Sequence, residues 1–183
     1  MCSSDLERRI LAQIEAQIVK LVETRELTGA VITGTERAFA AGAEISELAS
    51  LTAAAAFEFS RYGQGVMRAV ANSPKTVVAA IRGYCMGGGL DLALACDARI
   101  ASRDAVFAHP GGTLGIITGW GGTQRLPRLI GRSRAIEMLV TGRRLDAEEA
   151  LACGLVQKIA DESMVAEAIE QAQKIARAID SHD

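Results

Sequence analysis

Aromatic residues, histidines and cysteines are all scarce in this chain of 183 residues. Aromatics make up 4%, there are two histidines, and the four cysteines are scattered without a Cys-x-x-Cys pair. A zinc site is therefore not expected, and we predict no metal. The net charge of −2 implies no basic face, and few rings are available to stack on bases. Nucleic acid is accordingly not expected as a partner.

Long apolar runs and an apolar N-terminal segment are also missing. Residues 1–10 carry acidic residues and arginines, unlike a signal peptide, and no apolar run is long enough to cross a membrane. We expect a cytoplasmic protein with reduced cysteines and no membrane association. Hydrophobic residues amount to 49%, which is enough for one domain with a substantial core.

Short apolar strands alternate with amphipathic helices along the chain. Thr52 is expected to cap a long helix, and Asp146 with Glu149 forms a capping-box pattern for a helix that Gly154 ends. The other helices are expected at about 5–26, from 90, at 124–130, 133–140 and 163–179, and the strands at 29–33, 76–81, 98–101, 105–107 and 155–159. This order predicts an α/β layered fold with parallel strands, whose ligands bind at the C-terminal strand ends.

Two glycine-bearing loops, residues 39–45 and 83–89, each precede a predicted helix. A helix start has free backbone amides, and glycine lets a ligand approach them closely. Two such loops facing one site form an oxyanion hole, although phosphate binding and close packing are alternatives. Neither loop ends in the Lys-Ser/Thr of a Walker A motif, and the glycine spacing differs from a dinucleotide fingerprint. A dehydrogenase is therefore the least favoured enzyme class.

Four segments of the sequence resemble the crotonase (enoyl-CoA hydratase/isomerase) superfamily, in family order and with family spacing. They are RAFAAGAEISEL (37–48), IRGYCMGGGLDLALACDARIAS (81–102), GGTQRLPRLIG (121–131) and LVTGRRLDAEEALACGLV (139–156). The resemblance covers nearly the whole chain. It implies one domain over residues 1–183, with the ClpP/crotonase spiral of ββα units.

The resemblance also implies roles for individual residues. The amides of Ala43 and Gly88 match the family's oxyanion donors for a thioester carbonyl, and Asp91 matches its first acidic catalytic residue. A helix-start carboxylate that merely suits the helix dipole is the alternative for Asp91. The expected substrate is an acyl-CoA, with no separate cofactor. The residues implied to contact it are Ala41, Gly42, Gly87, Gly89, Gly111 and Trp120. For Trp120, packing in the core or in a subunit interface is the alternative.

One position departs from the family pattern. Gly111 follows Pro110 where hydratases have a second catalytic glutamate, although hydration needs two proton operations. A bound anion such as bicarbonate, as in dihydroxynaphthoyl-CoA synthases, is one substitute. His109 is a possible acid or base, or else a buried loop histidine bonded to backbone. If the loop backbone is family-like, Gly111→Glu is expected to improve hydration.

The function that the resemblance implies is an enoyl-CoA hydratase-like reaction through an enolate. Another enolate reaction of the family, such as an isomerisation, C–C bond synthesis or hydrolysis, remains open. A non-catalytic protein that binds acyl-CoA or a subunit is the alternative outside enzymes. The sequence further resembles a member without the usual N-terminal strands and C-terminal helices. A homotrimer or hexamer is expected at full length, with apolar surface exposed over residues 133–179.

Overall fold

Two parallel β-sheets form the centre of the computed structural model, which describes residues 6–35, 37–43, 45–160 and 164–180. The larger sheet has the strand order β1 (Gly29–Thr33), β3 (Thr76–Ile81), β5 (Ala98–Ala101) and β7 (Lys158–Ile159). The smaller sheet has the order β2 (Ala38–Ala40), β4 (Tyr84–Met86) and β6 (Val106–Ala108). All described strand pairs are parallel.

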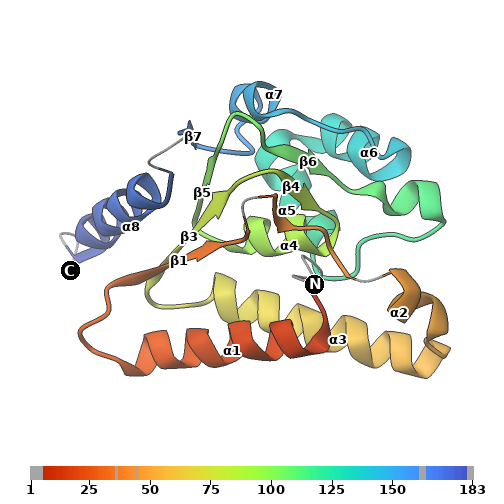
Figure 1. The fold of residues 1–183 in the computed structure, drawn as a ribbon, viewed down its shortest axis with the longest axis horizontal. Helices are drawn as coiled ribbons and strands as arrows, with labels where there is room; N and C mark the ends of the chain where they lie inside the picture. Colours follow the sequence, from red (N-terminus) through yellow and green to blue (C-terminus); the bar gives the residue numbers. More distant parts are fainter. Residues whose placement is uncertain (1–5, 36, 44, 161–163, 181–183) are drawn as a thin grey trace.

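The chain passes from the larger sheet to the smaller one and then into a helix, and it repeats this step. Thus β1 leads to β2, β3 to β4 and β5 to β6 (Figure 1). The helices are α1 (Arg8–Glu23), α2 (Ile45–Ser50), α3 (Ala53–Ala71), α4 (Gly88–Ala95), the 3₁₀-helix η1 (Pro110–Leu114), α5 (Gly122–Ile130), α6 (Arg132–Thr141), α7 (Ala147–Ala152) and α8 (Met164–Asp180). The expected spiral of ββα units is therefore confirmed.

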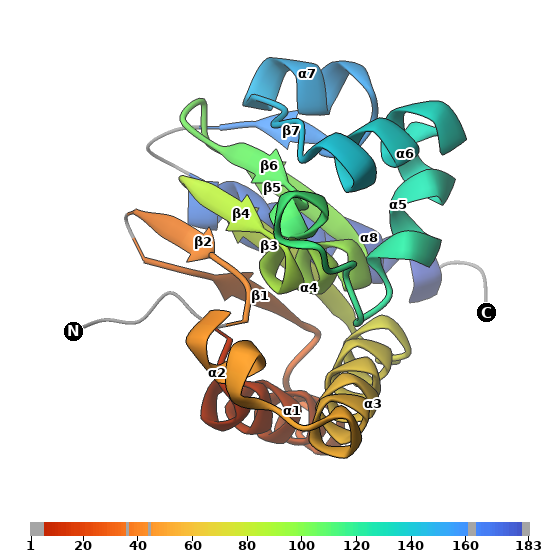
Figure 2. The same ribbon diagram turned by 90° about the vertical axis from the view of Figure 1, so that its right-hand side faces the viewer.

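The helices enclose the sheets from several sides. The α1 and α3 helices lie side by side along one face, while α8 packs against β1, β3 and β5 (Figures 1 and 2). Helix α4 lies against α3 and α5, and its residues from Gly89 to Ala95 are buried. Apart from Asp91, this helix is apolar on every side, which suits such a central place.

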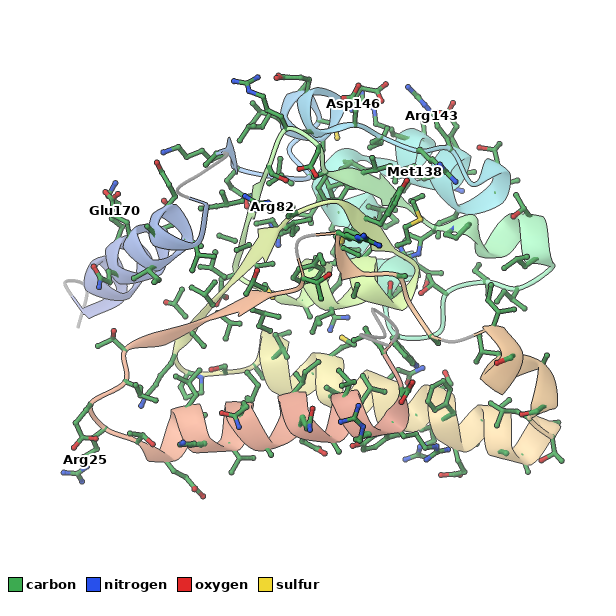
Figure 3. All side chains as sticks on the ribbon, viewed as in Figure 1. Arg25, Arg82, Met138, Arg143, Asp146 and Glu170 are labelled. Atoms are coloured by element: carbon green, nitrogen blue, oxygen red, sulfur yellow. The ribbon has the colours of Figure 1, made fainter. Side chains whose placement is uncertain are left out.

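Local sequence chemistry accounts for several of the predicted boundaries. All six residues of β3 are buried, as a parallel strand covered on both faces requires. The Thr52 hydroxyl accepts a hydrogen bond from the Ala55 amide at 3.3 Å and begins α3. Asp146 and Glu149 form the predicted capping box at α7. Beside it, Arg143 pairs with Glu149 at 2.6 Å and with Glu137 on α6. Figure 3 labels Arg143 and Asp146 in this region.

Four segments differ from the prediction. The loop expected at 39–45 includes part of β2, and the loop expected at 83–89 includes all of β4. The loop expected at 109–123 includes η1 and the start of α5. The strand expected at 155–159 is only Lys158–Ile159, because the amides of Leu155 and Val156 bond to the Ala150 carbonyl at the end of α7. The predicted start of the last helix at residue 163 lies outside the described residues. Within the described ranges, no helix is long and apolar enough to cross a membrane.

Candidate active site

A cavity of about 350 Å³ lies beside the start of α4. Its walls come from residues 41–43, helices α2 and α3, the first residues of α4, and the segment from His109 to Trp120. Most of the lining is apolar, and it includes Ile45, Leu48, Leu51, Ala56, Phe59, Leu114, Ile116 and Ile117. Such a cavity suits an apolar chain that ends in a polar group.

The two glycine loops of the sequence meet at this cavity. A Cβ atom at Gly42 would lie 3.1 Å from the Met86 carbonyl oxygen and 3.2 Å from the Gly88 nitrogen. The φ angles of Gly42 and Gly87 are +100° and +53°, a range that favours glycine. The backbones therefore approach so closely that side chains would separate the loops. Ala41, Gly42, Ala43, Gly87 and Gly88 all line the cavity.

The start of α4 faces the same space. Gly88 is the first residue of the helix, so its N–H belongs to the end group without an intrahelical acceptor. The helix dipole adds a partial positive charge there. Gly89 does not share this position. It packs against Ala40 of β2, where a Cβ would overlap the Ala40 carbonyl.

Trp120 both lines the cavity and packs in the core. A Cβ at Gly63 or at Gly88 would overlap its indole ring, so the ring fits between α3 and the start of α4. Phe59 meets the indole edge to face, with ring centroids 5.4 Å apart. Trp120 thus packs in the core, as one alternative from the sequence has it, and its predicted contact with the substrate stays a prediction.

Asp91 is fully buried in the first turn of α4. Its Oδ2 accepts hydrogen bonds from the Thr118 hydroxyl and, at 3.2 Å, from the Trp120 amide. Burial raises the pKa of Asp91 to about 6, while the hydrogen bonds from Thr118 and Trp120, the charge of Arg125 and the nearby Gly122 amide act in the opposite direction. The carboxylate is therefore buried and held by hydrogen bonds, unlike a carboxylate exposed to solvent at a helix start.

His109 directly follows β6 and faces this carboxylate. Its Nε2 lies 3.5 Å from Asp91 Oδ1. Neither nitrogen of the histidine, nor Asp91 Oδ1, has a hydrogen-bond partner among the described residues, although all three atoms are buried. Burial also lowers the pKa of His109 to about 4. The histidine is therefore neutral at pH 7, and it is not bonded to backbone as the alternative from the sequence supposed.

Gly111 lies in η1, where close packing accounts for the glycine. A Cβ at this position would lie 2.7 Å from the Ile116 carbonyl oxygen, and the Gly111 carbonyl accepts the Ile116 amide at 2.9 Å. This loop does not accommodate glutamate without moving its backbone. The expectation that Gly111→Glu improves hydration assumed a loop with room for the glutamate, and the contact with Ile116 removes that assumption. Among the described residues that line the cavity, Asp91 is the one carboxylate and His109 the one other ionisable group.

Two contributors to the site are not among the site residues expected from the sequence. Thr118 holds the carboxylate, and Gly122 makes room for the Asp91–His109 pair, because a Cβ there would overlap Asp91 Oδ1 and lie 2.8 Å from His109 Nε2. No group of three or more histidine, cysteine, aspartate or glutamate side chains suited to a metal occurs in the described part of the chain.

Comparison with known proteins agrees with this geometry. The sequence profile of the family described as Enoyl-CoA hydratase/isomerase matches residues 6–182. A Dictyostelium discoideum protein named "Probable enoyl-CoA hydratase, mitochondrial" is 40% identical over 168 residues, which are 91% of this chain and 60% of that protein. This chain therefore belongs to the enoyl-CoA hydratase/isomerase family, and it spans about 60% of the length of the Dictyostelium relative.

Solved structures show the same similarity. Enoyl-CoA hydratase from Bacillus anthracis superposes with a TM-score of 0.90 at 39% identity, covering 96% of this chain and 69% of that one. DspI from Pseudomonas aeruginosa gives a TM-score of 0.91 at 37% identity, covering 96% of this chain and 68% of DspI. The crotonase fold expected from the sequence is thus confirmed.

Proposed function

We propose that this chain carries the active site of an enoyl-CoA hydratase-like lyase, which acts on an acyl-CoA through an enolate. The observation that carries the proposal is the meeting of the two glycine loops at a cavity beside a buried carboxylate. Family membership and 40% identity to a protein named as a probable enoyl-CoA hydratase support it.

In this proposal, the N–H groups of Ala43 and Gly88 donate hydrogen bonds to the thioester oxygen. Donors fixed in a water-poor site stabilise an enolate oxygen, and one such donor contributes about 3–4 kcal/mol in comparable enzymes. The thioester lies between the two loops, with Ala41, Gly42 and Gly87 around it. The acyl chain extends past Trp120 and Gly111 into the apolar part of the cavity. In this proposal, the buried carboxylate of Asp91 lies at the cavity that holds the thioester.

In the proposed reaction, the enzyme uses no cofactor besides the CoA that is part of its substrate. Bicarbonate in the assay tests whether an accessory anion assists. A homotrimer or hexamer is part of the proposal, and exposed apolar side chains within residues 133–179 support it: Ile136, Val140, Leu151, Val165 and Ile169. The cytoplasmic location stays a prediction from the sequence, while the Dictyostelium relative is named as mitochondrial.

Two assays test the proposed chemistry. Hydration of crotonyl-CoA reports the whole reaction, and exchange of the α-proton of a saturated acyl-CoA with deuterated water reports enolate formation alone. Gly88→Pro should abolish both, because proline suits the first helical position but lacks the N–H. Gly88→Ala is the matched control: it brings the same Cβ against Trp120 and keeps the N–H. The difference between the two variants isolates the amide.

A non-catalytic protein that binds acyl-CoA is the competing function, and Gly111 in place of a second glutamate favours it. Binding of acyl-CoA with neither exchange nor hydration would support that function and reject the enzyme. Exchange without hydration would instead indicate another enolate reaction on the same site.

A further inference from the structure

The proposed hydration leaves one chemical role unfilled. Water must lose a proton, and the α-carbon must gain one. Gly111 has no side chain for either step, and its contact with Ile116 leaves no room for one. The ionisable groups that line the cavity, within the described residues, are Asp91 and His109. Among the side chains that the structure describes, both proton steps can therefore be assigned to this pair.

The carboxylate of Asp91 is poorly placed to do this work directly. Its Oδ2 already accepts hydrogen bonds from the Thr118 hydroxyl and the Trp120 amide. Its Oδ1 is buried and faces His109 Nε2 at 3.5 Å. Oδ2 is thus already satisfied, whereas Oδ1 is left to accept a hydrogen bond from the neighbouring ring.

His109 has the complementary arrangement. Both ring nitrogens are buried without a hydrogen-bond partner in the described structure, which is costly unless something completes the site. Nε2 is the nitrogen that lies next to Asp91. A short movement would close that distance to a hydrogen bond and would leave Nδ1 as the remaining atom for a ligand. Glycine at position 122 leaves the space that this approach needs.

We propose that His109 is the acid–base residue of this site and that Asp91 acts as its positioning residue. Asp91 Oδ1 accepts the Nε2–H and fixes the tautomer, so that Nδ1 exchanges protons with the reacting molecules. This assignment rests on the proposed acyl-CoA chemistry. It reverses the roles implied by the family resemblance, in which Asp91 itself moves the proton. Since burial keeps His109 neutral at pH 7, its Nδ1 carries the lone pair that a base requires.

One residue then suffices for both steps. Nδ1 accepts a proton from water as the water oxygen bonds to the β-carbon, and the π electrons of the double bond pass to the thioester oxygen as an enolate. The same proton then returns from His109 to the α-carbon, and the enolate reverts to the thioester carbonyl. Water has been added, the histidine is neutral again, and no other reactant is consumed. The charge of Asp91 stabilises the imidazolium between the two steps.

The first test measures the tautomer of His109 by nitrogen NMR on the full chain labelled with ¹⁵N-histidine. The chain has two histidines, so His182→Gln assigns the signals. We expect a proton on Nε2 and none on Nδ1 at pH 7 in the wild type. Asp91→Asn should remove this preference, because an amide can present a donor to Nε2. A proton on Nδ1 in the wild type would overturn the proposal.

The second test uses His109→Gln, whose amide can still donate to Asp91 but cannot exchange protons at neutral pH. Hydration of crotonyl-CoA and α-proton exchange should both fall by about 10²–10⁴-fold, while circular dichroism and CoA binding stay unchanged. His182→Gln is the matched control and should keep the wild-type rates. Wild-type rates in His109→Gln would overturn this inference alone, whereas an inactive wild type that binds acyl-CoA would reject the proposed function itself. If His109→Gln does not fold, the tautomer measurement decides.

Discussion

The buried Asp91–His109 pair makes two opposite contributions to the pH dependence of stability. The pKa of Asp91 is raised by burial from 3.8 to about 6. Between these values the folded state holds a proton that the unfolded chain has lost, so the free energy of unfolding falls as the pH rises. The pKa of His109 is lowered by burial from 6.5 to about 4. Between those values the unfolded chain holds the extra proton, so the free energy of unfolding rises with pH.

Each contribution amounts to about 3 kcal/mol, because one pH unit of difference between folded and unfolded pKa corresponds to about 1.4 kcal/mol. The two windows nearly coincide, so in the wild type they largely cancel. Asp91→Asn removes the falling contribution, and His109→Gln removes the rising one. From pH 4 to 6.5, the free energy of unfolding relative to wild type should rise by about 3 kcal/mol in Asp91→Asn and fall by about 3 kcal/mol in His109→Gln.

Urea denaturation at constant ionic strength, at several pH values from 4 to 6.5, measures these differences. Arg125 and Cys85 also interact with Asp91. Burial raises the pKa of the Cys85 thiol well above its usual value, so this thiol adds no pH dependence of stability in this range. Thr118→Val removes a hydrogen bond that lowers the pKa of Asp91, and it should extend the falling contribution above pH 6. Parallel profiles for Asp91→Asn, His109→Gln and wild type would refute this reasoning.

Three further substitutions test packing, each by urea denaturation. Gly111→Glu should lower the free energy of unfolding by about 1–3 kcal/mol without raising the hydration rate, because its Cβ meets the Ile116 carbonyl at 2.7 Å. Gly65→Ala should instead stabilise α3 by about 0.5–1 kcal/mol, since nothing lies within 4 Å of an added Cβ. Arg99→Met should cost about 3 kcal/mol or more, because the buried guanidinium donates to three backbone carbonyls that would lose their partner. A stable Gly111→Glu variant with faster hydration, an unstable Gly65→Ala, or a neutral Arg99→Met would each contradict the packing described.

Elements whose signal lies in their own residues are predictable from the sequence. The β3 strand is one threonine followed by five apolar residues, and its bounds match the prediction. The caps at Thr52 and Asp146 depend on side chains that bond to amides three residues away. Both glycine loops were found as well, because their composition is unusual and the family resemblance marks them.

Elements held by distant partners are not predictable in this way. The β4 strand has only three residues, and it is a strand because β2 and β6 pair with it on either side. Leu155 and Val156 look like strand residues, yet their amides are used by the end of α7. In both cases backbone hydrogen bonds outside the segment decide, and intrinsic β preference is weaker than such context.

The site follows the same division. Asp91, Gly88 and His109 were each singled out as candidates, but their arrangement depends on contacts between separate segments. Asp91 and His109 are 18 residues apart, and they meet because β6 ends beside the start of α4, where the Gly87 amide bonds to the Ala108 carbonyl at 2.9 Å. Gly122 reads as an ordinary helix-start glycine until the pair beneath it is seen. Close packing around a glycine does not recur at helical or strand spacing, so it cannot be predicted from the hydrophobic pattern of the sequence.

Helix α4 connects the two halves of the proposed chemistry. Gly88 and Asp91 are one helical turn apart, so the amide offered to the thioester oxygen and the carboxylate that faces His109 are fixed by the same rigid backbone. The other end of this helix is held by Arg99, which donates to the carbonyls of Ala93 and Cys96. A cation at that end favours the dipole whose positive pole lies at Gly88. Displacing α4 along its axis would therefore disturb the oxyanion donor and the acid–base pair together. The tight packing around the almost entirely buried α4 helix opposes such a displacement.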